Sequence, residues 1–370
     1  MWSFYNPTKI YFGEGEFENL PKYLNEISSQ KAFVVCSPFT VRTGLIDELI
    51  ALAPDRIAGY CDAVEPNPTI QNVDTCVAKA KEAGADCIIT IGGGSIMDCA
   101  KAVAVGIAME RTGAQILANE SPITAALPLI ALPTTSGTAS EVTAVTVLSD
   151  KEKGIKKPIA SPLMFPRIAV IDPQLTVSCP PGLTAASGLD ALMHALDALS
   201  STKSNPAADA LAIQSAKLVF NNLRRAYRDG SNMIARKNMA AASVLAGLAF
   251  SQTGTTGSHG CSYVLTTHYG MAHGTACAFT GDQWYLINSN ARPELNIFAS
   301  EFGLADSEGV ARRINQLKRE FEMPCTLAEA GIPVEDIPFI VESCMATANM
   351  SINIAPVTPE VLERMFKNLA

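Results

Sequence analysis

One aspartate and three of the chain's four histidines have the residue types and spacing of a metal site. Asp190 and His194 stand four residues apart in a segment expected to be helical, so their side chains share one face about one turn apart. His259 and His273 come from a second region, where each is followed by a glycine. One carboxylate and three imidazoles suit Fe(II), Zn(II) or a similar first-row ion and leave room for a substrate oxygen. These four residues are therefore the predicted metal ligands.

Each histidine taken alone is also compatible with a structural role inside the fold. The composition favours the metal site, because three of the four histidines belong to the set and the fourth, His268, lies between two of them. His268 and Tyr263 carry titratable side chains in the same region, so either is a candidate to relay a proton to solvent.

A glycine turn, Gly92–Ser95, joins the apolar run 88–91 to a helical stretch that begins at Ile96. Glycines let the backbone approach a diphosphate closely, and the free N–H groups and positive end of the following helix favour its charge. Ser95 is expected to cap this helix. An ordinary tight turn would have the same composition. The spacing also differs from the G-x-G-x-x-G pattern of the standard dinucleotide fold, so a dinucleotide bound here would use another pattern.

A second loop, Pro133–Glu141, follows another apolar strand and contains several hydroxyl side chains and one glycine. It places these groups where polar atoms of a cofactor could be held, although a plain Ser/Thr loop would look the same. Together the two loops favour a dinucleotide cofactor bound by the N-terminal half.

The elements that must position these residues differ between the two halves of the chain. From residue 30 to about 178, short apolar runs alternate with helix-like segments, which predicts a parallel sheet covered on both faces. These runs are 32–36, 86–91, 129–132 and 168–172.

After Cys179-Pro-Pro-Gly182 the pattern becomes helical. The expected helices cover 183–200, 205–228, 232–251 and 306–322. The Pro-Pro-Gly run marks the boundary. We predict an α/β nicotinamide-cofactor-binding domain over 1–180 and an all-helical metal-binding domain over 181–370.

The composition excludes several classes of protein. A chain of 370 residues that is 48% hydrophobic can bury the cores of two domains. Its net charge of −8, without a block of Lys or Arg, argues against nucleic-acid binding. We find no signal peptide, and apolar stretches such as 186–199 contain Asp or His, so a cytoplasmic protein with no membrane span is expected. The ten scattered cysteines form no CxxC pair, which predicts reduced, mostly buried thiols.

Over nearly its whole length the sequence resembles the iron-containing (group III) alcohol dehydrogenases. The matching segments are 11–15, 64–69, 92–95 with Asp98 and Lys101, 133–143, 172–176, 188–195 and 272–274. The resemblance implies a dehydroquinate synthase-like architecture, with an N-terminal α/β cofactor domain and a C-terminal all-helical metal domain.

Carried over position by position, the resemblance assigns the metal to the same four residues, Asp190, His194, His259 and His273. It assigns the cofactor contacts to Asn67, Gly93, Gly94, Ser95, Thr134, Thr135, Thr138 and Lys156. Asp98 of the glycine motif and Ser37 after the second strand complete the predicted cofactor site.

Two positions depart from the family pattern. Tyr263 stands four residues after His259, where many members have another histidine near the nicotinamide. Ser37 stands where NAD-preferring members often carry an aspartate for the adenosine ribose. Without that carboxylate a 2′-phosphate is not repelled, so we expect use of both NAD(H) and NADP(H).

The predicted function is that of a metal-dependent, NAD(P)-linked alcohol dehydrogenase or aldehyde reductase. It would act on a small primary alcohol or aldehyde by hydride transfer, with Fe(II) or Zn(II) as Lewis acid. Three alternatives remain: a glycerol- or diol-type dehydrogenase or a dehydroquinate synthase-like enzyme, a maleylacetate reductase, or a non-catalytic protein that retains an old metal site. A homo-oligomer, dimer or higher, is expected.

Overall fold

The computed structural model describes residues 1–370, which form two compact units. One unit is Asn6–Ser178, and the other combines Met1–Tyr5 with Cys179–Ala370. The first five residues join the second unit through a pair of hydrogen bonds. The Tyr5 backbone N–H donates to Gln252 Oε1, and Gln252 Nε2 donates to the Tyr5 carbonyl, both at 3.0 Å.

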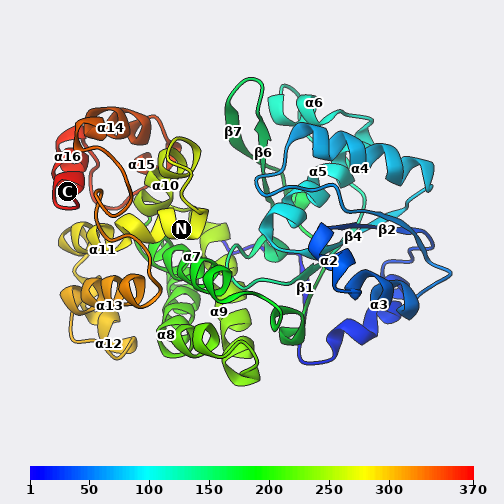
Figure 1. The fold of residues 1–370 in the computed structure, drawn as a ribbon, viewed down its shortest axis with the longest axis horizontal. Coiled ribbons are helices and arrows are strands. Elements are labelled where there is room, and N and C mark those ends of the chain that lie inside the picture. Colours follow the sequence, from blue (N-terminus) through cyan, green and yellow to red (C-terminus); the bar gives the residue numbers. More distant parts are fainter. The chain divides into compact units, whose positions relative to one another are not determined.

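A six-stranded parallel sheet forms the centre of the first unit, in the order β1-β8-β5-β4-β2-β3. Three of its strands, β1, β2 and β4, are labelled in Figure 1. The strands are β1 (Lys9–Phe12), β2 (Ala32–Cys36), β3 (Ile57–Cys61), β4 (Cys87–Gly92), β5 (Leu129–Pro133) and β8 (Ile168–Ile171). The parallel sheet expected from the sequence is therefore confirmed.

Both faces of this sheet are covered, and for that reason its central strands are apolar without alternation. In β2, Phe33 and Val35 belong to a core with α4 and α5, whereas Val34 and Cys36 belong to a core with α1 and α3 on the other face. The covering helices are α1 (Leu20–Glu26), α3 (Leu45–Leu52), α4 (Ile70–Glu82) and α5 (Gly94–Met109). The shorter elements are α2 (Pro38–Arg42), α6 (Gly113–Ala118) and the 3-10 turns Glu16–Asn19, Ser140–Val142, Pro162–Met164 and Pro173–Thr176.

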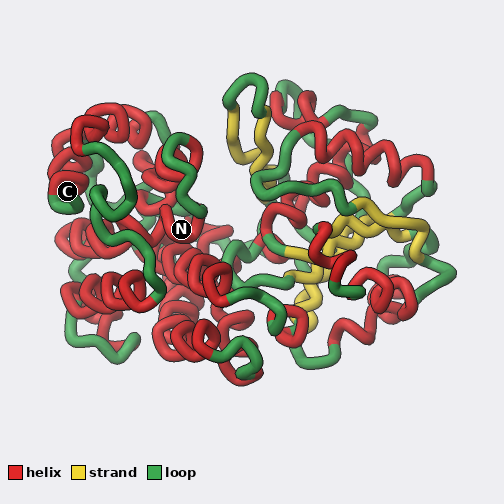
Figure 2. The backbone as a smooth tube through the Cα atoms, in the orientation of Figure 1, coloured by secondary structure: helices red, strands yellow, loops and turns green.

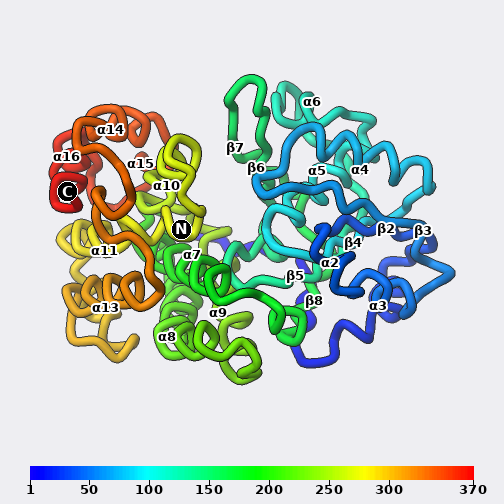
Figure 3. Tube along the Cα trace, in the orientation of Figure 1, coloured from blue at the N-terminus to red at the C-terminus, as the bar shows by residue number.

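The sequence pattern did not predict an antiparallel hairpin in this unit. It consists of β6 (Val145–Asp150) and β7 (Ile155–Ala160), drawn in green in Figure 3. β7 contains two lysines and a proline, and only its Ile159 is buried, so it lacks the apolar signal of the central strands. Gly154 closes the turn with a φ of 63°, a left-handed conformation that glycine adopts without strain.

The second unit is built almost entirely of helices (Figure 2). They are α7 (Pro181–Leu199), α8 (Pro206–Arg228), α9 (Met233–Thr253), α10 (Gly257–Thr267), α11 (His273–Ala291), α12 (Glu294–Glu301), α13 (Ser307–Glu320), the 3-10 turn Val334–Asp336, α14 (Ile337–Met345), α15 (Ala348–Ser351) and α16 (Pro359–Lys367). The four helices expected from the sequence are present within a few residues of their predicted ends. None of the helices is long and apolar enough to cross a membrane.

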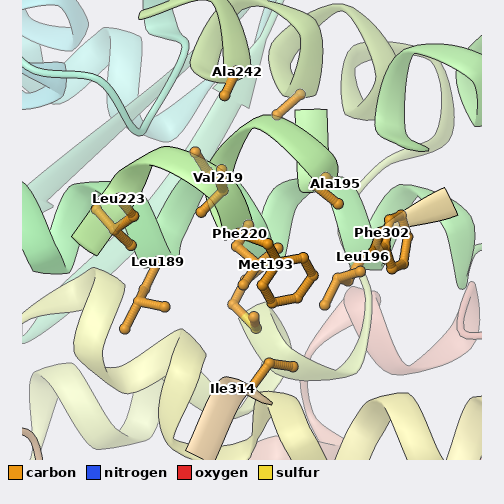
Figure 4. Close-up of a cluster of buried hydrophobic side chains, with 14 of the residues drawn as sticks. Leu189, Met193, Ala195, Leu196, Val219, Phe220, Leu223, Ala242, Phe302 and Ile314 are labelled. Atoms are coloured by element: carbon orange, nitrogen blue, oxygen red, sulfur yellow. The ribbon is translucent and has the colours of Figure 1, made fainter. Parts of the chain in front are cut away.

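The core of this unit is rich in alanine and lies around α7, α8 and α9 (Figure 4). Small side chains let the helices approach closely, and Gly188 shows how closely, because a Cβ there would overlap the Leu223 side chain. The same face of α7 carries Leu192 and Ala195, both fully buried. This packing fixes α7, the helix that carries the predicted ligands Asp190 and His194.

Candidate metal centre and cofactor loops

Three polar side chains follow one another along the buried face of α7. Asp190, His194 and Asp197 are spaced at i, i+4 and i+7, and all three are buried. His194 Nδ1 lies 3.9 Å from Asp190 Oδ2. Helix α7 therefore presents two predicted ligands and one further carboxylate to the same region.

Asp197 holds the start of α10 and orients His259. Its carboxylate accepts hydrogen bonds from the Thr256 backbone N–H at 2.7 Å and from Ser258 Oγ at 2.9 Å. His259 Nδ1 donates to Asp197 Oδ2 at 2.7 Å. This bond leaves Nε2 free to bind a metal, and Nε2 lies 3.6 Å from Asp190 Oδ1.

His273 is the first residue of α11, and its Nε2 lies 3.7 Å from the same Asp190 Oδ1. Gly274 brings α11 against α7, because a Cβ at that position would overlap the Ala186 carbonyl and come within 3.1 Å of Asp190 Cβ. The glycines that follow the histidines thus lie inside helical packing, not in loops.

Two atoms at this centre lack a partner. Asp190 Oδ1 and His259 Nε2 are buried and make no hydrogen bond, in side chains that are 3% and 6% exposed. Leaving such atoms unsatisfied costs roughly 1–3 kcal/mol each, so a cation between them would remove a real penalty. The residues present fit a first-row metal ion.

Cys277 completes the tightest group of donors. The ligand atoms of Asp190, His259, His273 and Cys277 all lie within 4.8 Å of one another. His194 lies beside this group, with its ring stacked on His259 at 4.4 Å and on Phe250 at 4.2 Å between centroids. Three of the four predicted ligands therefore share this group with a thiol, and the fourth, His194, borders it beside Asp190 and His259.

The electrostatics keep Asp190 and His194 in metal-binding form. Burial raises the pKa of Asp190, but the imidazoles of His194, His273 and His259 outweigh it and hold that pKa well below its usual range. Burial lowers the pKa of His194 to about 4, so its imidazole is neutral at pH 7. A carboxylate and a neutral imidazole are the forms that bind metal. For His259 and His273, burial lowers the pKa, but the nearby Cys277 and Asp190 outweigh burial and raise it, so an ion bound there displaces protons.

The two proton-relay candidates lie in different surroundings. Tyr263 is on α10, four residues after His259, and burial raises its pKa. His268 is exposed and packs against Tyr269 and Phe339, with ring centroids 4.8 and 4.7 Å away.

Sequence reasoning missed Asp197 and Cys277. Asp197 continues the spacing of Asp190 and His194 along α7, and Cys277 stands four residues after His273 on α11. The same-face rule that identified Asp190 and His194 would have identified both.

The predicted cofactor residues gather at one edge of the sheet. Strands β2, β4 and β5 are parallel neighbours, so their carboxyl ends at Cys36, Gly92 and Pro133 share that edge. The chain leaves β2 toward β3 and leaves β4 toward β5, in opposite directions along the sheet. Open α/β sheets bind ligands at such a switch point.

The two predicted loops contact each other there. The Thr134 backbone N–H donates to the Gly92 carbonyl at 3.0 Å. A Cβ on Gly93 would lie 3.2 Å from Thr135 Oγ1, and one on Gly94 would lie 2.6 Å from Thr138 Cγ2. Glycine at 94 is thus required by the neighbouring loop.

Ser95 does not cap the helix, contrary to the sequence prediction. Helix α5 begins at Gly94 with Gly93 in the extended cap position, so Ser95 already lies in the first turn. Its Oγ accepts from the Asn67 backbone N–H at 3.2 Å, and Lys156 Nζ donates to Asn67 Oδ1 at 2.8 Å. Three predicted cofactor residues that are distant in sequence are therefore neighbours.

Asp98 has both carboxylate oxygens occupied by the protein. Oδ1 accepts from Ser140 Oγ at 2.7 Å and Oδ2 accepts from the Val147 N–H at 2.9 Å. Lys101 is buried beside it and donates to Ser140 Oγ at 2.7 Å. These two residues hold the 133–143 loop on α5.

Ser37 is the cap of α2, where its Oγ accepts from the Thr40 N–H at 3.2 Å. It follows β2 directly and so stands at the same edge of the sheet as Gly92. All ten cysteines are free and buried, as the sequence predicted.

Comparison with known proteins identifies both halves of the chain. Residues 7–173 match the family model "Iron-containing alcohol dehydrogenase", and residues 184–370 match "Fe-containing alcohol dehydrogenase family, C-terminal". Alcohol dehydrogenase 4 of Saccharomyces cerevisiae is 35% identical, over 98% of this chain and 97% of the yeast protein. The 1-propanol dehydrogenase PduQ of Citrobacter freundii is 32% identical over the full length of both.

A solved structure extends the likeness to the fold. Sulfoacetaldehyde reductase from Bifidobacterium kashiwanohense, in complex with NAD+, matches with a TM-score of 0.97 and 34% identity, over 100% of this chain and 99% of that one. The dehydroquinate synthase-like architecture implied by the resemblance is thereby confirmed. From its motifs, its fold and these relatives, the chain belongs to the iron-containing alcohol dehydrogenase family of oxidoreductases.

Proposed function

We propose that this protein is a metal-dependent, nicotinamide-linked dehydrogenase that interconverts a small primary alcohol and its aldehyde. The observation that carries the proposal is the convergence of Asp190, His194, His259 and His273, with two buried potential ligand atoms left without a hydrogen-bond partner. A second feature also supports catalysis: the separate α/β unit carries a glycine turn of the phosphate-binding type at its switch point. A protein that only binds metal would not need this turn.

The names of the relatives support the substrate class. They include a 1-propanol dehydrogenase and a sulfoacetaldehyde reductase, the latter bound to NAD+. Both act on a short carbon chain with a terminal alcohol or aldehyde. We assign the cofactor to the unit Asn6–Ser178 and the metal to the unit that contains Cys179–Ala370.

The residues present divide the chemistry between them. Asp190, His194, His259 and His273 would hold Fe(II) or Zn(II), which supplies a Lewis acid for the alcohol or carbonyl oxygen. Asp197 fixes the tautomer of His259, so that Nε2 keeps its lone pair for the ion. Tyr263 and His268 are the candidates for exchanging the alcohol proton with solvent.

On the cofactor side, the free N–H groups at the start of α5 would bind the diphosphate. Asn67, Ser95 and Lys156 form a polar cluster beside that turn. The backbone N–H of Thr134 and the side chains of Thr135 and Thr138 border it from the second loop, and Ser37 would face the adenosine ribose. The protein then mainly positions the hydride donor and acceptor.

Reconstitution tests the proposal. Protein stripped with a chelator is reloaded with Fe(II) or Zn(II) and assayed with short aldehydes and alcohols, glycerol and 1,3-propanediol included, using NADH and NADPH. We expect turnover only after metal is restored, and neither metal binding nor turnover in His273→Ala. Full activity in a verified metal-free preparation would contradict the proposal, and selective turnover of glycerol or diols would favour the diol-type alternative. Light scattering on the same protein tests the expected homo-oligomer.

A further inference from the structure

We propose that Cys277 is itself a ligand of the metal, which gives the centre a thiolate beside the carboxylate and imidazoles. This inference rests on the proposed function, because it requires an ion at Asp190. It makes the centre softer than one built from carboxylate and imidazole alone, and softer ligands favour Zn(II) over Fe(II).

The geometry places the sulfur among the donors. Cys277 is fully buried on α11, one turn after His273, and its Sγ lies 3.7 Å from His273 Nε2. Together with Asp190 and His259 it forms the group whose ligand atoms lie within 4.8 Å of one another. Small shifts of these side chains would bring all four atoms to bonding distance of one ion.

Two ligand atoms of this group also lack hydrogen bonds, which is a separate observation. Asp190 Oδ1 and His259 Nε2 are the unpartnered buried atoms of the centre, and both belong to the group that contains the sulfur. An ion bound by them would therefore lie beside Sγ. A thiol so placed loses its proton to solvent when it binds the ion, and the thiolate becomes the ligand.

The other buried cysteines have different surroundings. Cys76 Sγ lies 2.8 Å from Cys61 Sγ in the core of the α/β unit, and Cys344 is buried in an apolar cluster around α14. Of the ten cysteines, Cys277 alone belongs to a group of potential metal donors. It is therefore the cysteine to test as a ligand, and Cys344 is a matched control.

Cobalt and zinc report the thiolate directly, without an activity assay. We expect Co(II)-loaded wild-type protein to show a thiolate-to-cobalt charge-transfer band in the near ultraviolet. X-ray absorption of the zinc protein should show a sulfur neighbour at about 2.3 Å beside nitrogen and oxygen neighbours at about 2.0–2.2 Å. Both measurements use the wild-type chain and so do not depend on how a variant folds.

Variants then test whether the sulfur ligand belongs to Cys277. Cys277→Ser should lose the charge-transfer band and bind Zn(II) at least about tenfold more weakly in competition with a chelator. Cys344→Ser should keep the band and the affinity.

The outcomes separate this inference from the proposed function. Stoichiometric cobalt binding that is lost in Asp190→Asn, but without a charge-transfer band or a sulfur neighbour, would overturn the role of Cys277 and leave the metal centre intact. Absence of stoichiometric metal binding in the wild-type protein would overturn both.

Discussion

At the scale of single residues, Asp197 shows how a carboxylate that is not a predicted ligand can control one. It accepts from the Thr256 N–H, Ser258 Oγ and His259 Nδ1, so one side chain fixes both the start of α10 and the plane of the imidazole. Burial opposes its charge, but the hydrogen bond from His259 outweighs burial and lowers the pKa of Asp197.

We expect Asp197→Asn to weaken metal binding about 10- to 100-fold, because the amide removes the charge and turns one acceptor into a donor. Chelator competition measures the change. Asp282→Asn is the control, since Asp282 is also buried in this unit but pairs with Lys318 at 2.7 Å. Equal losses of metal affinity in both variants would mean that Asp197 acts only through general stability.

Ser37 gives a residue-scale test of cofactor choice. Aspartate and serine cap helices about equally well, so Ser37→Asp should leave α2 intact. The added carboxylate would repel a 2′-phosphate, and we expect kcat/KM for NADPH to fall about tenfold, near 1.4 kcal/mol, while that for NADH is kept. Ser37→Asn, which caps without charge, should keep both values. An unchanged cofactor ratio in Ser37→Asp would show that residue 37 does not face the ribose.

At the scale of elements, the 133–143 loop is held to α5 by buried charges. Lys101 donates to Ser140 Oγ and Thr143 Oγ1, and Glu141 is buried with Oε2 unpartnered. Burial raises the pKa of Glu141 to about 7 and lowers that of Lys101 to about 8.

This arrangement predicts a pH-dependent stability. The pKa of Glu141 is higher in the folded state, about 7, than its ordinary value of 4.5, so its contribution is fully present below pH 4.5 and is lost as the pH rises toward 7. Glu141→Gln should remove that loss and be more stable than wild type at pH 8, by up to roughly 3 kcal/mol. Thermal unfolding from pH 5 to 8 measures this, with exposed Glu152→Gln as control. If Tm changed with pH in the same way for the wild type and Glu141→Gln, Glu141 would ionise freely in the folded protein.

The elements also show what the sequence could and could not predict. Residues 32–36 and 129–132 were predictable as strands because they are apolar throughout, and Asp190 with His194 because one helix spaces them. Strand β7 was not predicted from the sequence because its polar residues are stabilised by pairing with β6, not by burial in the main core. Cys277 shares a face of α11 with His273, four residues earlier, which the sequence does show, but its approach to Asp190 and His259 depends on α7 and α10 and could not be predicted.

At the scale of the whole molecule, the ligands and the cofactor loops belong to separate compact units. Because metal binding stabilises the elements that supply its ligands, removal of the ion should loosen α7, α10 and α11 first. We expect hydrogen exchange after chelation to rise at residues 181–199, 257–267 and 273–291 and to stay unchanged in β4 and β5. NADH binding should survive. A uniform rise across both units would mean that they unfold as one.

The contact between Gly274 and the Ala186 carbonyl also bears on protein design. Position 274 binds nothing, yet any side chain there would force α11 away from α7 and separate His273 from Asp190. If every residue of the site is replaced in turn and metal retention is measured, substitutions of Gly274 should therefore be tolerated as poorly as substitutions of the ligands beside it. A design that transfers the metal ligands to another helical scaffold would have to transfer this backbone contact as well, because it sets the distance between the two helices.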